Sequence, residues 1–320
     1  MAESHWTEEK EVGGTLPLFL LLTMVRIFPS WLLRLIAAPI SFFYYLFVPR
    51  AREFCRIYQK QLYSFYVQHD KVPVVKRLHI YRQIYAFALA IVEKVQGWSG
   101  HIFLKNVHFQ DDDVQDLIAT LEQKKGVLVI TSHLGNVEML RSLMGYNRTA
   151  VNRTFPVITI GNITSTKKFN AVLERINPQY DMTMITSETI GPGTIIQLQE
   201  KLASGAMVVL AGDRTSESTQ KRVIEHDFLG KKASFPYGVY LLAALLQVPV
   251  YFIFSLRKKD TSLVLDYDMH VHKSTSVFSG LRKERETYIH ALNDEFVTYL
   301  EKYTAEHPFQ WYNFYNFWAK

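Results

Sequence analysis

From about residue 101 onward, short β-rich apolar runs alternate with helical stretches, and this alternation constrains the fold more than any other feature. Helices are expected at 165–176, 192–204, 235–247 and about 280–304. Strands that alternate with helices predict an α/β fold with a largely parallel central sheet flanked by helices. The expected strands are GVLVIT (126–131), PVITI (156–160), MTMIT (182–186), AMVVLAG (206–212), VPVYFIFSL (248–256) and LVLDYDMHV (263–271).

The N-terminal part is apolar and lacks this alternation. Residues 15–50, TLPLFLLLTMVRIFPSWLLRLIAAPISFFYYLFVPR, contain no acidic residue. We expect Pro29 and Pro39 to break helical continuity. The longest uncharged run, 35–49, is shorter than the about 20 residues that a membrane-crossing helix needs. We therefore expect a helical hairpin or re-entrant segment lying in the membrane; a buried pair of core helices is the alternative.

Basic residues follow this apolar segment directly. Such cations favour the cytoplasmic, anionic side of a membrane. The net charge of +6 also suits an anionic membrane face or an acidic ligand, and the single cysteine excludes an internal disulfide. The cations are Arg50, Arg52, Arg56 and Lys60.

Two units are expected along the chain. Residues 1–50 would form a tail and a membrane-associated segment, and residues 51–320 would form the α/β domain. Two amphipathic helices, over 51–69 and 74–97, would open that domain.

One histidine stands where α/β proteins place their chemistry. His133, in TSHLGNVE, follows the strand at 126–131 and precedes a helix, and ligands gather at that edge of a sheet. Glu138 could accept the proton-bearing ring nitrogen and fix the tautomer, which leaves the other nitrogen as a general base. The chain has no accompanying cysteine or Gly-x-Ser-x-Gly elbow, so the base would activate a substrate hydroxyl. A capping histidine with a solvated glutamate is the alternative.

Two other classes of function find little support. His270 and His272 alternate on one strand face, but the sequence offers no evident third ligand, so no metal site and no cofactor are expected. Aromatic residues are not interleaved with basic ones in any recognised nucleic-acid module.

Four blocks in order resemble the lysophospholipid acyltransferase superfamily, and within it the late acyltransferases of lipid A synthesis. The first block holds His133 and Glu138 in the His-x4-acid motif. The opening HWTEEKEVGG resembles a branch of predicted acyltransferases found in bacterial gene clusters for aryl polyenes and related lipids. The later blocks are AGDRTSES (211–218) with DFLGKKASFPYG (227–238), then VPVYF (248–252), then HPFQWYNFYNFWAK (307–320).

The chain departs from the late acyltransferases at three places. Asp213, Arg214 and Thr215 replace an aspartate-glutamine-aspartate run, and the closing His-Arg pattern is replaced by Asn313, Tyr315 and Asn316. A further arginine, which the second motif of the family would carry, is not evident; Lys167 and Lys168 are the nearest cations. These departures argue against lipid A as the acceptor more than against acyl transfer.

The resemblance implies a membrane-associated O-acyltransferase on the cytoplasmic face of the bacterial inner membrane. It would move a fatty acyl chain from an acyl carrier protein or coenzyme A thioester to a lipid hydroxyl or amine. Backbone N–H groups near Gly135 and Asn136 could receive the oxyanion. Asp213, Arg214 and Gly230 could contact substrate.

Three assignments keep an alternative. Arg214 could hold a phosphate or phosphopantetheine, or form a surface salt bridge. Gly230 could be a plain turn. Lys231 and Lys232 could meet an acidic carrier protein or be solvated. For the whole chain, the alternatives are a non-catalytic lipid-binding protein and an acyl thioesterase.

Overall fold

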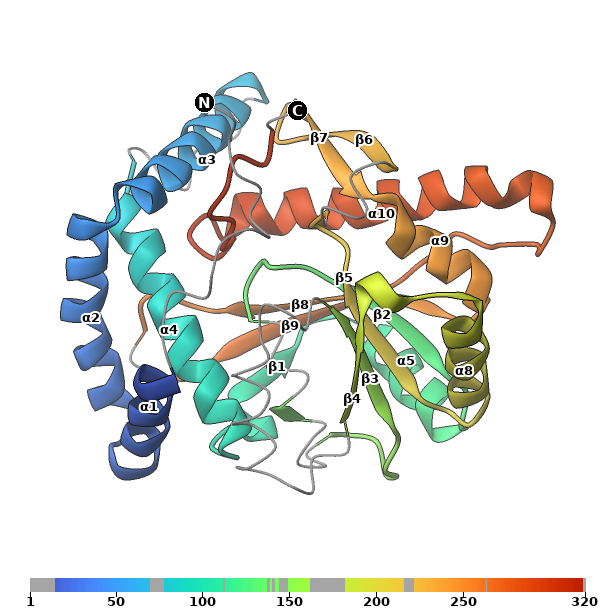
Figure 1. Cartoon of the computed structure of the whole chain (residues 1–320), viewed down its shortest axis with the longest axis horizontal. Coiled ribbons are helices and arrows are strands. Elements are labelled where there is room, and N and C mark those ends of the chain that lie inside the picture. The colour runs from blue at the N-terminus through green and yellow to red at the C-terminus, as the bar shows by residue number, and fades with distance from the viewer. Residues whose placement is uncertain are drawn as a thin grey trace.

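Seven strands form one central sheet in the order β1-β9-β8-β2-β5-β3-β4 (Figure 1). The computed structural model describes residues 15–69, 78–111, 113–136, 139, 142–143, 149–161, 182–215, 222–262 and 264–318. The helix expected at 165–176 lies outside these residues. The strands are β1 Val107–Phe109, β2 Val127–Thr131, β3 Val157–Gly161, β4 Met182–Thr186, β5 Met207–Ala211, β8 Val250–Arg257 and β9 Tyr267–Lys273.

The sheet is mostly parallel, as the sequence predicted. Within this sheet, β8–β9 is the only antiparallel pairing among the described strands. Residues 258–266 join these two strands, and this link is shorter than the dozen or more residues that a parallel crossover requires. A separate antiparallel hairpin of β6 Val223–Phe228 and β7 Lys231–Pro236 was not predicted, and β7 takes the first residues of the helix expected at 235–247.

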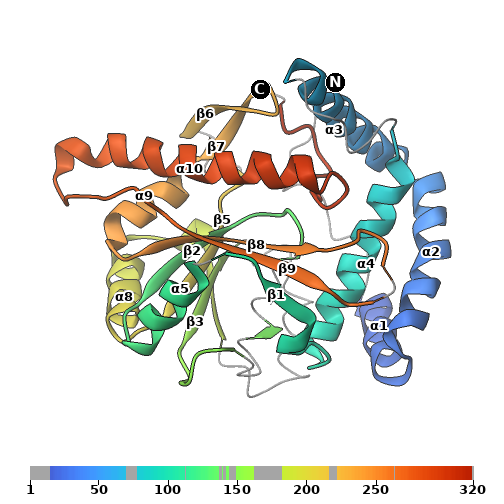
Figure 2. The same ribbon diagram turned by 180° about the vertical axis from the view of Figure 1, so that it is seen from behind.

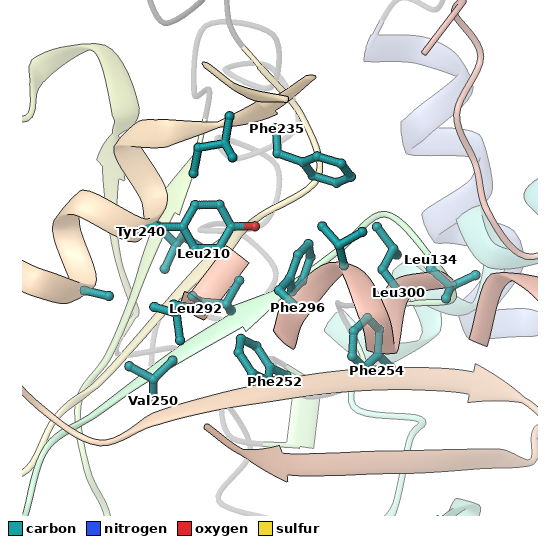
Figure 3. Close-up of a cluster of buried hydrophobic side chains, with 14 of the residues drawn as sticks. Leu134, Leu210, Phe235, Tyr240, Val250, Phe252, Phe254, Leu292, Phe296 and Leu300 are labelled. Atoms are coloured by element: carbon teal, nitrogen blue, oxygen red, sulfur yellow. The ribbon is translucent and has the colours of Figure 1, made fainter. Parts of the chain in front are cut away.

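Helices cover both faces of the sheet (Figures 1 and 2). Helices α8 (Pro192–Ala203), α9 (Tyr237–Leu246) and α10 (Arg285–Glu306) pack on one face, and α5 (Asp113–Glu122) packs on the other. Figure 3 shows the larger core between α10 and the sheet, where Phe296 lies near Phe252 and Phe254. These apolar side chains follow the sheet and helix periods that the sequence displayed.

Four N-terminal helices stand beside one end of the sheet: α1 (Thr15–Ile27), α2 (Ser30–Phe47), α3 (Pro49–Gln68) and α4 (Ile80–Trp98). The chain breaks between α1 and α2 at Pro29, as expected, but α2 continues through Pro39, so the second predicted break is wrong. Among the described residues, α2 alone is long and apolar enough to cross a membrane. One side of it packs on α4, while Trp31 and Phe47 are exposed on the other.

A buried ionic cluster joins α2 and α4 to the sheet. The Glu93 carboxylate in α4 pairs with Arg34 of α2 and with Arg257 at the end of β8, the latter at 2.5 Å, and all three side chains are at most 1% exposed. The Tyr267 hydroxyl donates to the same carboxylate. Burial alone would raise the pKa of Glu93, but Arg257 and Arg34 hold that pKa below its ordinary value. The carboxylate is therefore ionised and compensates two buried cations.

We expect Glu93→Gln to lower the free energy of unfolding by about 3–5 kcal/mol, because two guanidinium groups would lose their buried counter-charge. The control is Glu53→Gln, which removes a solvent-exposed pair with Arg56 and should cost less than about 1 kcal/mol. Denaturant titration measures both. Equal losses in the two variants would contradict the structural role of the cluster.

Candidate active site

His133 lies two residues beyond the carboxyl end of β2, at the edge of the sheet where the sequence placed it. Its side chain is 34% exposed, so the ring is accessible from outside while its other side faces the protein. Ser132 before it is buried. This position suits a group that must meet a substrate yet keep a fixed orientation.

Asp213 is the direct partner of this histidine. Strands β2 and β5 pair in parallel with Thr131 opposite Ala211, so the residues two positions further on, His133 and Asp213, emerge side by side. The Oδ1 atom of Asp213 lies 2.8 Å from His133 Nδ1, and Oδ2 accepts the His133 backbone N–H at 2.9 Å. The indole Nε1 of Trp311 also reaches Oδ2, at 3.4 Å. Backbone and ring are thus held by one carboxylate that is 1% exposed.

Electrostatics favour a neutral imidazole beside an ionised carboxylate. Burial, followed by the Arg214 charge, lowers the pKa of His133 below its ordinary value, although Asp213 opposes both. Burial would raise the pKa of Asp213, but His133 and Arg214 together lower that pKa. With Asp213 ionised, Nδ1 carries the proton that the carboxylate accepts, and Nε2 retains its lone pair.

Gly135 and Asn136 shape the loop rather than offering free N–H groups. The Gly135 N–H donates to the Gln310 carbonyl and the Asn136 N–H to the Ser255 carbonyl, both at 2.8 Å. Both N–H groups are therefore occupied in this structure, and an oxyanion role for backbone groups around Gly135 and Asn136 stays a prediction. Gly135 has a φ of 74°, and a Cβ there would lie 2.0 Å from the Ser255 oxygen, so only glycine fits this close approach to β8.

The C-terminal segment forms the other side of the His133 loop. The Tyr312 N–H donates to the His133 carbonyl at 3.2 Å, and Leu134 and Trp311 form an antiparallel bridge. The Gln310 side chain donates to the Arg257 carbonyl at 2.7 Å and accepts its N–H at 2.8 Å, which locks the segment to β8. The aromatic C-terminal segment therefore packs into the core and supports the His133 loop.

Arg214 is half-buried next to the pair. Its guanidinium donates to the Tyr312 carbonyl at 2.7 Å and lies 5.9 Å from the centre of the Tyr315 ring. The side chain therefore bridges the end of β5 and the C-terminal segment, and its charge acts on both His133 and Asp213.

Gly230 has a different place. It forms the β6–β7 turn with Leu229, where both residues have positive φ, as two-residue hairpins require. A Cβ on Gly230 would meet Gln68 at 2.9 Å, so this turn lies against α3. The plain-turn alternative accounts for this glycine, while Lys231 and Lys232 beside it are exposed.

Glu138 lies outside the described residues, so its contact with His133 stays a prediction. What sequence reasoning missed was the pairing of His133 with Asp213 and the support from Gln310 and Trp311. The sequence does contain a signal for the first pairing. Each of the apolar runs VLVIT and MVVLA is followed, two positions after its last residue, by a polar residue: His133 and Asp213.

Comparison with known proteins identifies the family of this chain. The chain has no match among curated proteins. Residues 66–320 match the profile of a family described as bacterial lipid A biosynthesis acyltransferase. The match includes both members of the His133–Asp213 pair and the C-terminal segment that supports them. It spans well over half of the sequence, and the chain belongs to the bacterial lipid A biosynthesis acyltransferase family.

Proposed function

We propose that this chain transfers a fatty acyl chain from a thioester to a lipid hydroxyl or amine, with His133 as general base oriented by Asp213. The observation that carries the proposal is the 2.8 Å contact between His133 Nδ1 and a buried carboxylate, at the ligand-binding edge of an acyltransferase-family sheet. A histidine–carboxylate pair of this kind orients the ring and stabilises the imidazolium that forms on proton transfer.

The chemistry follows from the free ring nitrogen. Nε2 of His133 takes the proton of the acceptor hydroxyl as its oxygen attacks the thioester carbonyl. The tetrahedral intermediate then expels the thiolate, the C–S bond breaks, and the imidazolium returns its proton to sulfur. Asp213 keeps Nδ1 protonated throughout and balances the transient positive charge on the ring.

The remaining assignments belong to this proposal. Glu138 would add a second carboxylate near the ring. The donor would be an acyl carrier protein or coenzyme A thioester, and Lys231 and Lys232 offer exposed positive charge for an acidic carrier. Arg214, anchored by the Tyr312 carbonyl, could neutralise a phosphate of donor or acceptor. The oxyanion would be met by groups other than the Gly135 and Asn136 N–H groups, because those are occupied.

The site would work on the cytoplasmic surface of the bacterial inner membrane. Support comes from the outer side of α2 and the α1–α2 turn, where large apolar side chains are exposed. Such a surface suits insertion into the bilayer interface. Two of the basic side chains of α3 already have partners within the protein: Arg52 donates to the Leu46 carbonyl, and Arg56 pairs with Glu53. The apolar side chains are Ile27, Phe28, Trp31, Leu35, Ile40, Phe42, Phe43, Leu46 and Phe47.

His133→Ala and Asp213→Asn should each reduce acyl transfer by about 10²–10⁴-fold, because the first removes the base and the second removes its orienting charge. Membranes from cells that express each variant are assayed with radiolabelled acyl carrier protein or acyl-coenzyme A and total host lipid. Glu138→Gln in the same assay tests the predicted second carboxylate.

The matched control is His108→Ala, which removes another histidine–aspartate pair, with Asp266, on the surface. If His133→Ala transferred as much label as wild type, the proposal would be wrong. Label that enters free fatty acid instead of lipid would identify a thioesterase, and membrane binding without turnover would favour a lipid-binding protein.

The pH profile should move in opposite directions in two variants. The base acts when neutral, so kcat/KM falls as pH drops through the pKa of His133, which lies below its ordinary value. Arg214→Gln removes a charge that lowers this pKa, so the acid limb should shift to higher pH. Asp213→Asn removes a charge that raises it, so the limb of the residual activity should shift to lower pH.

Lys283→Gln, which removes an exposed cation just before α10, is the control and should leave the acid limb in place. Shifts in the same direction for Arg214→Gln and Asp213→Asn would show that a group other than His133 governs the profile.

Phe43→Asp combined with Phe47→Asp should weaken binding to anionic phospholipid vesicles by about tenfold or more, because charge replaces exposed apolar surface that would enter the bilayer. Vesicle sedimentation measures the bound fraction. Val277→Asp is the control: Val277 is 89% exposed and precedes α10, whose start lies at the far end of the molecule from α2 (Figure 1). Equal loss in both variants would contradict α2 as the membrane-facing element.

A further inference from the structure

Two histidines on β9 share one face with two tyrosines of α10. His270 and His272 alternate along the strand, so their rings lie on the same side of the sheet. The His270 ring stacks on Tyr303 at 4.4 Å between centroids, and the His272 ring stacks on Tyr299 at 3.9 Å. Both imidazoles are thus held in place by packing before any ligand arrives.

Asp111 adds a carboxylate that could serve as a third metal ligand and that the sequence did not reveal. It follows β1, which pairs in parallel with β9, so the end of β1 brings this carboxylate beside the two rings. Its Oδ2 lies 3.0 Å from His270 Nδ1, and its Oδ1 lies 3.9 Å from His272 Nδ1. One donor atom from each of the three residues lies within 4.8 Å of the other two. The expectation that His270 and His272 have no third ligand nearby is therefore wrong.

The separations suit a small transition-metal ion. Bonds of about 2.0–2.2 Å from Zn²⁺ to nitrogen and oxygen place tetrahedral ligand atoms about 3.4 Å apart. The two separations that join Asp111 to the histidines are measured to different carboxylate oxygens, Oδ2 to His270 Nδ1 at 3.0 Å and Oδ1 to His272 Nδ1 at 3.9 Å. Each lies about half an ångström from that value, so both rings are within reach of an ion bound to the carboxylate.

The far nitrogen of His272 has a partner of the kind that orients metal-binding histidines. Its Nε2 lies 2.6 Å from the Tyr303 hydroxyl, so Nδ1 is the atom that faces Asp111. When Nε2 carries the ring proton and donates it to that hydroxyl, Nδ1 presents a lone pair. Burial lowers the pKa of His272, although Asp111 opposes this, and the neutral ring is the form that binds a metal.

We propose that Asp111, His270 and His272 bind one divalent transition-metal ion of the Zn²⁺ class, with water completing the coordination. Two imidazoles and one carboxylate form a ligand set that Zn²⁺ and Co²⁺ accept. The bound ion would tie the turn between β1 and α5 to β9, at the face covered by α10. The site is separate from the His133–Asp213 pair and does not depend on the proposed acyl transfer.

The experiment uses purified full-length protein, freed of any affinity tag and treated with a chelator. Zn²⁺ affinity is measured by competition with a chromophoric chelator, and the Co²⁺ absorption spectrum reports the ligand field. Wild type should bind one equivalent. Asp111→Asn, His270→Gln and His272→Gln should each weaken binding by about tenfold or more, since even outer-shell changes cost 10–100-fold.

His108→Gln is the matched control, because His108 pairs with Asp266 on the surface at 2.8 Å, and this variant should bind Zn²⁺ as wild type does. If any of the three variants fails to fold, X-ray absorption of the Zn²⁺-loaded wild type decides instead, with two imidazole ligands expected. The proposal is overturned if wild type binds no ion stoichiometrically, if binding survives in all three variants, or if the spectrum shows other than two imidazoles.

Discussion

The site depends on the hydrogen bonds made by the buried carboxylate of Asp213. It accepts the ring N–H and the backbone N–H of His133, and the Trp311 indole reaches the same oxygen as the backbone group. A carboxylate that is 1% exposed is costly unless its acceptor positions are filled. The same contacts that stabilise Asp213 therefore fix the position of the loop, the tautomer of the ring and the C-terminal segment.

A second buried charge connects the site to the apolar N-terminal helices. Glu93 joins Arg34 of α2 to Arg257 at the end of β8. The Gln310 side chain binds the Arg257 backbone. The backbone carbonyl of Gln310 in turn accepts the Gly135 N–H. The apolar helix and the His133 loop are thus connected through a continuous set of buried polar contacts.

Much of the fold could be predicted from the sequence because its strands are buried on both faces and read as continuous apolar runs. Runs such as VLVIT and MVVLA give both the sheet and its mostly parallel character. The β6–β7 hairpin was missed because VIEHDF carries several charged residues, and because Leu229, unlike Gly230, gives no sign in the sequence of its positive φ. Helix α2 continues through Pro39, where packing on α4 outweighs the local cost of proline.

The candidate site was predicted in part, for a physical reason. The position of His133 follows from local order, a strand followed by a turn, and the sequence contains both. Its partner Asp213, and the Asp111 carboxylate beside His270 and His272, come from parallel neighbours that are far away in the chain, so only the strand order reveals them. The same long-range pairing occupies the Gly135 and Asn136 N–H groups, which local reasoning had left free.

The most direct test of the central claim is the tautomer of His133. Nitrogen NMR of ¹⁵N-histidine-labelled protein near neutral pH, with the His133 signal assigned through His133→Gln, distinguishes a protonated Nδ1 from a protonated Nε2. The account predicts a neutral ring with the proton on Nδ1, facing Asp213, and an unprotonated Nε2. A proton on Nε2, or a ring that is fully charged at pH 7, would contradict the assignment of His133 as the general base.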